Sequence, residues 1–160
     1  MEEKFEFTND FKVTGKIDCT GESQQTVLLI DFKSATVPSK KDVLNYDNLQ
    51  LWTYAQAASR SIENFVHKNI ILGFVSLDKP DNSSLLLSSG EQAAKLKGIA
   101  KCDVFEGGFK ELLEASADKM TSLTLAIAAE KDFAAIPRTA NACKYCELTK
   151  VCVKSVVKHE

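Results

Sequence analysis

Residues 27–33 of this chain read Val-Leu-Leu-Ile-Asp-Phe-Lys, four apolar residues followed by two charged ones on either side of an aromatic ring. A strand that is apolar at every position is typical of one covered on both faces of its sheet. We therefore predict a central strand over residues 27–33. Because side chains alternate along a strand, Asp31 and Lys33 are predicted to share one face. Ile30 and Phe32 then point to the other face.

The segments around this strand predict an α/β fold. Alternating and β-branched residues indicate further strands at residues 5–7, 11–19, 69–77 and 84–88. After a polar loop at residues 34–42, an apolar stripe with helical spacing predicts a helix that begins between residues 45 and 48. The residues of this stripe are Leu51, Ala55, Ala58, Ile62 and Phe65.

Two more helices are predicted in the second half of the chain. Residues 91–101 favour a short helix, and residues 108–129 a long one that covers the sheet. Pro137 ends the helical regularity. The long stripe consists of Phe109, Leu112, Leu113, Ser116, Met120, Leu123 and Ile127.

Length and composition favour one compact domain over residues 1–160. The chain is 44% apolar, which is enough for a real core at this length. No run approaches the ~20 apolar residues that a membrane span needs, and the amino terminus lacks the pattern of a secretion signal. We therefore expect a soluble, cytoplasmic protein.

Charge is placed unevenly along the chain. The formal net charge is -2, so no general positive field attracts nucleic acid, and any contact with DNA must be local. Residues 2–10 are acidic, whereas the carboxyl end is basic and is the better candidate for a phosphate-facing surface; a solvated basic helix face is an equal alternative. The candidate DNA contacts are Lys40, Lys41, Arg138, Lys144, Lys150 and Lys154.

Asp18 and Asp31 lie on adjacent strands of a predicted hairpin. Charged groups at the end of an apolar strand are costly unless a partner or a cation compensates them. A divalent metal ion bound by both carboxylates would do so and would promote phosphodiester hydrolysis, with Lys33 steadying the water or the phosphoryl oxygens. A surface carboxylate beside a solvated lysine is the alternative interpretation of these residues alone.

The next helix adds Gln50 and Tyr54, which share one helix face because they are four residues apart. The succession Gly15-Lys16-Ile17-Asp18, then Asp31-Phe32-Lys33, then Leu49-Gln50-Leu51-x-x-Tyr54-Ala55 resembles the RecB-type branch of the PD-(D/E)XK nuclease superfamily. The core motifs span residues 13–65. Together with the cysteines, the resemblance covers most of the chain.

The resemblance implies a restriction-endonuclease-like mixed central β-sheet flanked by α-helices. It implies a Mg²⁺- or Mn²⁺-dependent, exonuclease-type phosphodiesterase that acts on DNA beside a helicase domain or subunit in a repair or recombination machine. Asp18, Asp31 and the backbone carbonyl of Phe32 become metal ligands, and Lys33 the catalytic lysine. Gln50 and Tyr54 support the lysine and the DNA backbone. A partly buried pair that satisfies its own hydrogen bonds is the alternative for these two residues.

The chain departs from this branch at its start, where a further His or Glu is expected on a helix before the first strand. We expect that the 160 residues are a fragment of a longer protein, that they bind metal weakly and cleave DNA feebly or not at all, and that the intact protein is active.

Three cysteines stand close together near the end, in residues 136–158. Cys143, Cys146 and Cys152 have the spacing C-x2-C-x5-C, which favours a metal or cluster over a disulfide framework. The spacing resembles part of the [4Fe-4S] site of AddB-like nucleases, whose fourth cysteine precedes the nuclease strands and is absent here. Zinc and a purely structural role are the alternatives.

Two further functions fit parts of the sequence. One is a nuclease-like module that has lost activity and clamps a DNA end or docks a partner. The other is a small zinc-binding interaction domain, which explains the cysteines alone. The presence of Asp18, Asp31, Lys33 and Gln50 together favours the nuclease.

Overall fold

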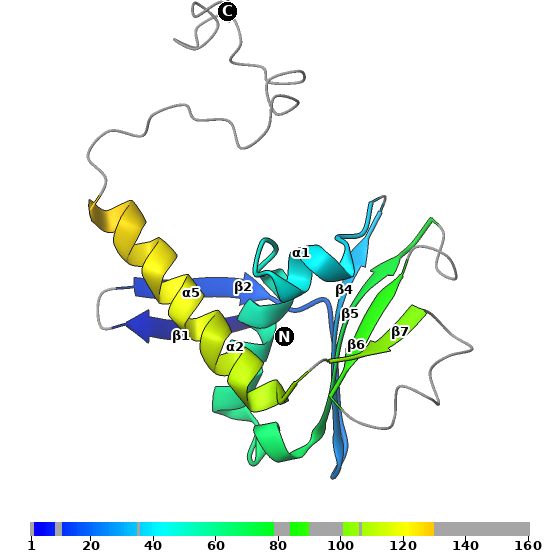
Figure 1. Cartoon of the computed structure of the whole chain (residues 1–160). Helices are drawn as coiled ribbons and strands as arrows, with labels where there is room; N and C mark the ends of the chain where they lie inside the picture. The colour runs from blue at the N-terminus through cyan, green and yellow to red at the C-terminus, as the bar shows by residue number, and fades with distance from the viewer. Residues whose placement is uncertain are drawn as a thin grey trace, which may run out of the picture. The chain divides into compact units, whose positions relative to one another are not determined.

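The computed structural model describes residues 2–8, 11–34, 36–78, 84–89, 101–105 and 107–129 (Figure 1). The chain divides into two compact units, Met1–Thr124 and Leu125–Glu160, and the architecture below is that of the first. Its elements in chain order are β1 (Glu2–Thr8), β2 (Phe11–Lys16), β3 (Cys19–Glu22), β4 (Thr26–Lys33), α1 (Lys40–Leu44), α2 (Gln50–Ser61), the 3-10 helix η1 (Phe65–His67), β5 (Asn69–Ser76), β6 (Leu85–Ser88), β7 (Lys101–Val104) and α5 (Phe109–Ala129).

The main sheet is mixed and has the strand order β3-β4-β5-β6-β7. Strands β3 and β4 are antiparallel, β4 and β5 parallel, β5 and β6 antiparallel, and β6 and β7 parallel. The connection between the parallel strands β4 and β5 contains α1 and α2, as expected for a crossover. This is the α/β, restriction-endonuclease-like arrangement that was predicted.

Strand β4, predicted to be a central strand, is an interior strand between β3 and β5, while β5 is the middle strand of the sheet. The predicted strand at residues 11–19 is wrong as one element, because β2 ends at Lys16 and β3 begins at Cys19. β2 pairs with β1 in a separate two-stranded sheet, whereas β3 pairs with β4 in the main sheet. Ile17 and Asp18 form the link between the two sheets.

The predicted loop at residues 34–42 contains the start of the short helix α1. Its capping box uses Ser39, whose Oγ accepts from the Asp42 amide at 3.2 Å, and Asp42, whose Oδ2 accepts from the Ser39 amide at 3.0 Å. Helix α2 begins later than predicted, at Gln50. The helix also ends before the last two residues of the predicted apolar stripe. Ile62 is the C-cap of α2, and Phe65 is buried in η1.

Helix α2 packs on β4 and β5, and α5 lies against α2 as an outer layer (Figure 1). The amide nitrogen of Gln56 on α2 donates to the Leu113 carbonyl at 2.6 Å and to Ser116 Oγ at 3.0 Å on α5. The long helix α5 thus lies over the sheet with α2 between them. Leu123 and Ile127, two residues of its predicted stripe, are 39% and 59% exposed, so the buried stripe ends at Met120.

The core centres on Trp52, which is fully buried on α2. Its indole nitrogen donates to the Val43 carbonyl at 2.8 Å, which satisfies the polar group of this large ring. Tyr46, Phe105 and Phe109 surround the ring with centroid distances of 5.5, 5.8 and 6.2 Å. This aromatic cluster joins α2 to the residues before and within α5.

Other predicted elements have mixed outcomes. Strands β5 and β6 confirm the predictions for residues 69–77 and 84–88. The predicted helix at residues 91–101 falls outside the described residues except for Lys101, which begins strand β7. Pro137 also lies outside them. No helix in the described ranges is long and apolar enough to cross a membrane.

Candidate active site

The site is built at the end of strand β4. Asp31 is buried, with 3% of its surface exposed, although its neighbour Phe32 is 42% exposed. The Lys33 ammonium lies 2.7 Å from Oδ2 of Asp31. This contact confirms that Asp31 and Lys33 share one face of β4, and strand alternation directs Phe32 to the other.

Gln50, the first residue of α2, stands between the two charged groups. Its Nε2 donates to Oδ1 of Asp31 at 2.6 Å, and its Oε1 accepts from the Lys33 ammonium at 2.7 Å. The donor end of the amide therefore faces the carboxylate and its acceptor end faces the ammonium, which is the orientation that the chemistry of an amide requires. Asn48 supports the start of α2, because its Oδ1 accepts from the Gln50 amide at 3.1 Å.

Tyr54 lies one helical turn after Gln50 and is buried. Its hydroxyl is 2.8 Å from Oδ1 of Asp31 and 3.2 Å from the Lys16 carbonyl, and it accepts from Nε2 of Gln50 at 3.0 Å. Burial raises the pKa of Tyr54 to about 12, so the hydroxyl keeps its proton at neutral pH and can donate. The Tyr54 hydroxyl therefore joins the end of β2 to Asp31 on β4.

Oδ2 of Asp31 is buried, and its described partner is the Lys33 ammonium at 2.7 Å, which neutralises the carboxylate. A buried carboxylate is costly without such a positive partner, and a divalent cation is another group that can compensate it. Carboxylate oxygens are hard ligands of the kind that Mg²⁺ prefers, so the Asp31 carboxylate is suited to bind such a metal.

Asp18 lies in the link between β2 and β3. Its Oδ2 accepts from the Phe32 backbone amide at 3.0 Å, which holds its carboxylate beside the end of β4. Hydrogen bonds and an ion pair thus join four of the residues predicted for the site, Asp31, Lys33, Gln50 and Tyr54. The fifth, Asp18, is tied to the same end of β4 through the Phe32 amide.

Of the predicted DNA contacts and cysteine ligands, only Lys40 and Lys41 lie within the described residues. Lys40 on α1 lies 3.7 Å from Oδ2 of Asp103 on β7, while Lys41 is exposed. Among the described residues, no group of three or more His, Cys, Asp or Glu could hold a metal ion. The remaining predicted residues lie outside the described part of the chain: Arg138, Cys143, Lys144, Cys146, Lys150, Cys152 and Lys154.

Sequence reasoning missed three groups at the site. They are the Lys16 carbonyl, the Asn48 side chain and the Phe74 ring, which lies under the Lys33 ammonium at 5.2 Å from nitrogen to centroid. Asn48 could have been found, because Asn is favoured just before a helix. Phe74 contacts Lys33 through the β4–β5 register, which pairs Asp31 with Phe74, and no local pattern predicts that register.

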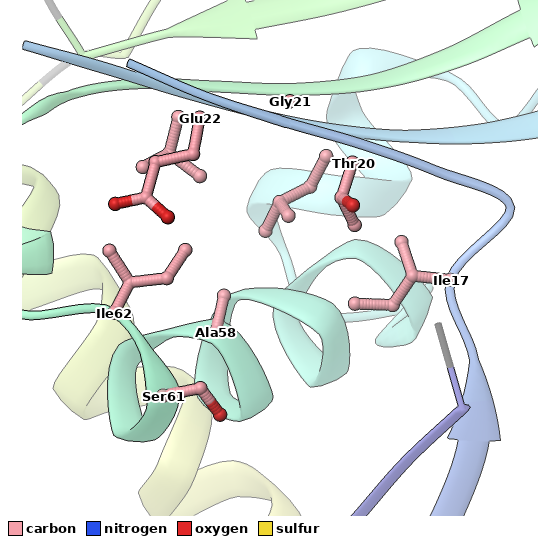
Figure 2. Close-up of a pocket in the computed structure, with 9 residues that line it drawn as sticks. Ile17, Thr20, Gly21, Glu22, Ala58, Ser61 and Ile62 are labelled. Atoms are coloured by element: carbon pink, nitrogen blue, oxygen red, sulfur yellow. The ribbon is translucent and has the colours of Figure 1, made fainter. Parts of the chain in front are cut away.

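A pocket of about 220 Å³ lies along the same side of α2 but does not include the acidic site (Figure 2). Side chains from β3 and from the second half of α2 face each other across it. Most of its lining is apolar, and the residue nearest the acidic site in sequence is Ile17. The labelled lining residues are Ile17, Thr20, Gly21, Glu22, Ala58, Ser61 and Ile62.

The model of one protein family, described as the PD-(D/E)XK nuclease superfamily, matches residues 1–153. The chain belongs to the PD-(D/E)XK nuclease superfamily. Members of the superfamily are generally nucleases that hydrolyse phosphodiester bonds and typically use divalent metal ions. No curated protein and no solved structure matches the chain. In this PD-(D/E)XK domain, the matched range includes every residue of the acidic site.

Proposed function

We propose that this PD-(D/E)XK domain is a metal-dependent deoxyribonuclease that hydrolyses phosphodiester bonds in DNA. The observation that carries the proposal is the buried Asp31 carboxylate, whose Oδ2 lies 2.7 Å from the Lys33 ammonium at the end of an apolar strand. An ion pair whose carboxylate is buried at the end of an apolar strand contributes little to stability on balance, so a catalytic role explains it better than a structural one.

Asp18, Asp31 and the backbone carbonyl of Phe32 would hold Mg²⁺ or Mn²⁺. When bound, the cation supplies charge withdrawal from the phosphate and lowers the pKa of water. The carboxylates of Asp18 and Asp31 come from adjacent segments that the Asp18–Phe32 hydrogen bond joins. That bond keeps one carboxylate oriented while Tyr54 and Gln50 orient the other.

Lys33 is the residue that would touch the substrate. Its ammonium carries the charge and donors needed to bind a phosphoryl oxygen whose negative charge grows during hydrolysis, or to hold the attacking water. Gln50 positions this ammonium through its Oε1. Tyr54 is a positioning residue for Asp31, since its hydroxyl faces the carboxylate and the Lys16 carbonyl.

The wider assignment rests on the sequence. We propose a RecB- or AddB-type protein in which this domain acts beside a helicase during repair or recombination, with exonuclease-type cleavage of a DNA strand or duplex end. Lys40, Lys41 and the basic carboxyl end, with Arg138, Lys144, Lys150 and Lys154, are proposed to bind the DNA backbone.

The cysteines belong to a separate part of the proposal. Cys143, Cys146 and Cys152 would ligate a [4Fe-4S] cluster in the intact protein, with a fourth cysteine from outside this chain. Replacement of Cys146 by Ser in anaerobically purified intact protein should remove the iron-sulfur absorbance. Unchanged iron content in that variant would reject the cluster.

The nuclease proposal is tested by titrating Mn²⁺ and Mg²⁺ into the intact protein with a fluorescent DNA substrate. Metal-dependent cleavage is expected, and Asp31→Asn should lower it to background and weaken metal binding in calorimetry. Asp118→Asn, at an exposed carboxylate on α5, is the matched control and should behave as the unmodified protein. Metal binding that does not depend on Asp31 would refute the site, and tight DNA binding without cleavage in the intact protein would favour an inactive docking module.

A further inference from the structure

Within the described part of the chain, the Lys33 ammonium contacts Asp31, Gln50 and Phe74. It lies 2.7 Å from Oδ2 of Asp31, donates to Oε1 of Gln50 at 2.7 Å, and lies over the Phe74 ring. The contact with Asp31 involves an oxygen that a metal ion would need. The contacts with Gln50 and Phe74 do not involve the carboxylate.

The two oxygens of Asp31 differ in their partners. Oδ1 is close to two donors, Nε2 of Gln50 at 2.6 Å and the Tyr54 hydroxyl at 2.8 Å. The described partner of Oδ2 is the Lys33 ammonium, at 2.7 Å. With the side chain of Asp31 only 5% exposed, Oδ2 is the oxygen that remains for a cation, and Lys33 already occupies its surroundings.

We propose that Lys33 holds the place of the metal ion in the metal-free protein, and that its ammonium leaves Asp31 but keeps its hydrogen bond to Gln50 when the metal binds. This inference rests on the proposed nuclease function. Two positive charges at one buried oxygen repel each other, and the buried setting screens that repulsion weakly. The ammonium and the cation therefore compete for Oδ2.

Gln50 makes the exchange possible without loss of the lysine from the site. Asp31 and Tyr54 together orient the amide, because its Nε2 faces two acceptor oxygens. Oε1 stays turned toward Lys33 in consequence. The ammonium can thus leave Oδ2 and keep Gln50 and the Phe74 ring as neighbours, which leaves its remaining donors for a phosphate oxygen.

The exchange has a consequence for the metal-free protein. The Lys33 ammonium neutralises a carboxylate that would otherwise be buried with one oxygen uncompensated. Removal of the lysine charge should therefore weaken the metal-free fold and strengthen metal binding. These effects have opposite signs, which a general loss of structure would not produce.

The first test measures Mn²⁺ and Mg²⁺ binding to the full chain by calorimetry, with Lys33→Met and the charge-retaining Lys33→Arg. Lys33→Met should bind the metal about tenfold more tightly, whereas Lys33→Arg should stay close to the unmodified protein. Unchanged or weaker binding by Lys33→Met overturns the competition and leaves the nuclease proposal standing. Absence of binding by all three proteins overturns both.

The second test follows the Lys33 ammonium directly, by nitrogen NMR of the lysine side chains. Its signal is assigned by its loss in Lys33→Met. Saturating Mg²⁺ should shift this signal in the unmodified chain, and in Gln50→Met the same addition should broaden it beyond detection, because no acceptor remains. A Lys33 signal that Mg²⁺ leaves unmoved overturns the exchange, even where Lys33→Met binds more tightly through charge alone.

Discussion

The hydroxyl of Tyr54 lies 2.8 Å from Oδ1 of Asp31, although 23 residues separate them in the chain. The same hydroxyl is 3.2 Å from the carbonyl of Lys16, the last residue of β2. One phenol on α2 therefore connects β2 with Asp31 on β4, although the two strands belong to different sheets. The Tyr54 hydroxyl stabilises the domain only while it keeps its proton, because only the protonated form can donate to Asp31.

Replacement of Tyr54 by Phe should destabilise the domain by about 1–2 kcal/mol at neutral pH, because the carboxylate loses a hydrogen-bond donor. The folded-state pKa of Tyr54 is raised from 10.0 to about 12 by burial. The stabilisation by the Tyr54 hydroxyl is therefore complete below pH 10 and is lost as pH rises toward 12.

The measurement is urea denaturation of both proteins between pH 8 and pH 12. The unmodified protein should lose stability relative to Tyr54→Phe over the upper part of that range, by up to about 2 kcal/mol. Tyr46, whose pKa burial also raises, is present in both proteins and cancels. A stability difference independent of pH would contradict the buried, protonated phenol.

Two substitutions of Asp18 should separate its structural and its metal-binding roles. Asn keeps an oxygen that can accept from the Phe32 amide, whereas Ala removes it. Asp18→Ala should cost about 1 kcal/mol of stability and Asp18→Asn little. Both should weaken Mn²⁺ binding by about tenfold or more, because the charge is gone.

Calorimetry gives the Mn²⁺ affinity of the two Asp18 variants, and urea denaturation of the same samples gives their free energy of unfolding. Metal affinity that survives in Asp18→Asn would remove this residue from the proposed ligands and leave it a role in joining the β2–β3 link to β4.

Gln56 should matter for the packing of α5 on α2. Its buried amide donates to the Leu113 carbonyl and to Ser116 Oγ, and Leu in its place would remove both bonds. We expect Gln56→Leu to cost about 1–3 kcal/mol. Gln24→Leu, in the exposed turn before β4, is the control and should change stability by less than about 0.5 kcal/mol. Equal stability of the two variants would show that these bonds add nothing to the helix packing.

Gly73 on β5 has no room for a side chain. A Cβ there would collide with Leu86 and would lie 2.8 Å from Cδ1 of Ile30 and 3.1 Å from the Leu85 carbonyl oxygen. Gly73→Ala should therefore destabilise the sheet by about 1–3 kcal/mol. Gly15→Ala, where no neighbouring atom is found within 4 Å, should be nearly neutral.

Trp52 is the only tryptophan and is fully buried, so its fluorescence reports unfolding of both glycine variants. A Gly73→Ala protein that unfolds at the same urea concentration as Gly15→Ala would mean that Leu86 and Ile30 move aside at little cost.

Local patterns predicted much of this fold because burial on one or both faces leaves a periodic trace in the sequence. The apolar run of β4, the strand at residues 69–77 and the long helix at residues 108–129 were all found in this way. The break at Ile17 and Asp18 was not found, since apolar and polar residues alternate through it without interruption. Strand β7 was missed because its four residues depend on pairing with β6.

The sequence alone determined which side chains are available: two carboxylates, a lysine, a glutamine and a tyrosine, at spacings that resemble one nuclease branch. Tertiary structure decided what each of them contacts. The placement of Gln50 between Asp31 and Lys33, and the reach of Tyr54 to the Lys16 carbonyl, follow from strand register and from the packing of α2 on β4. These relations join residues 17 to 38 positions apart, and only the folded core brings such residues within hydrogen-bond distance.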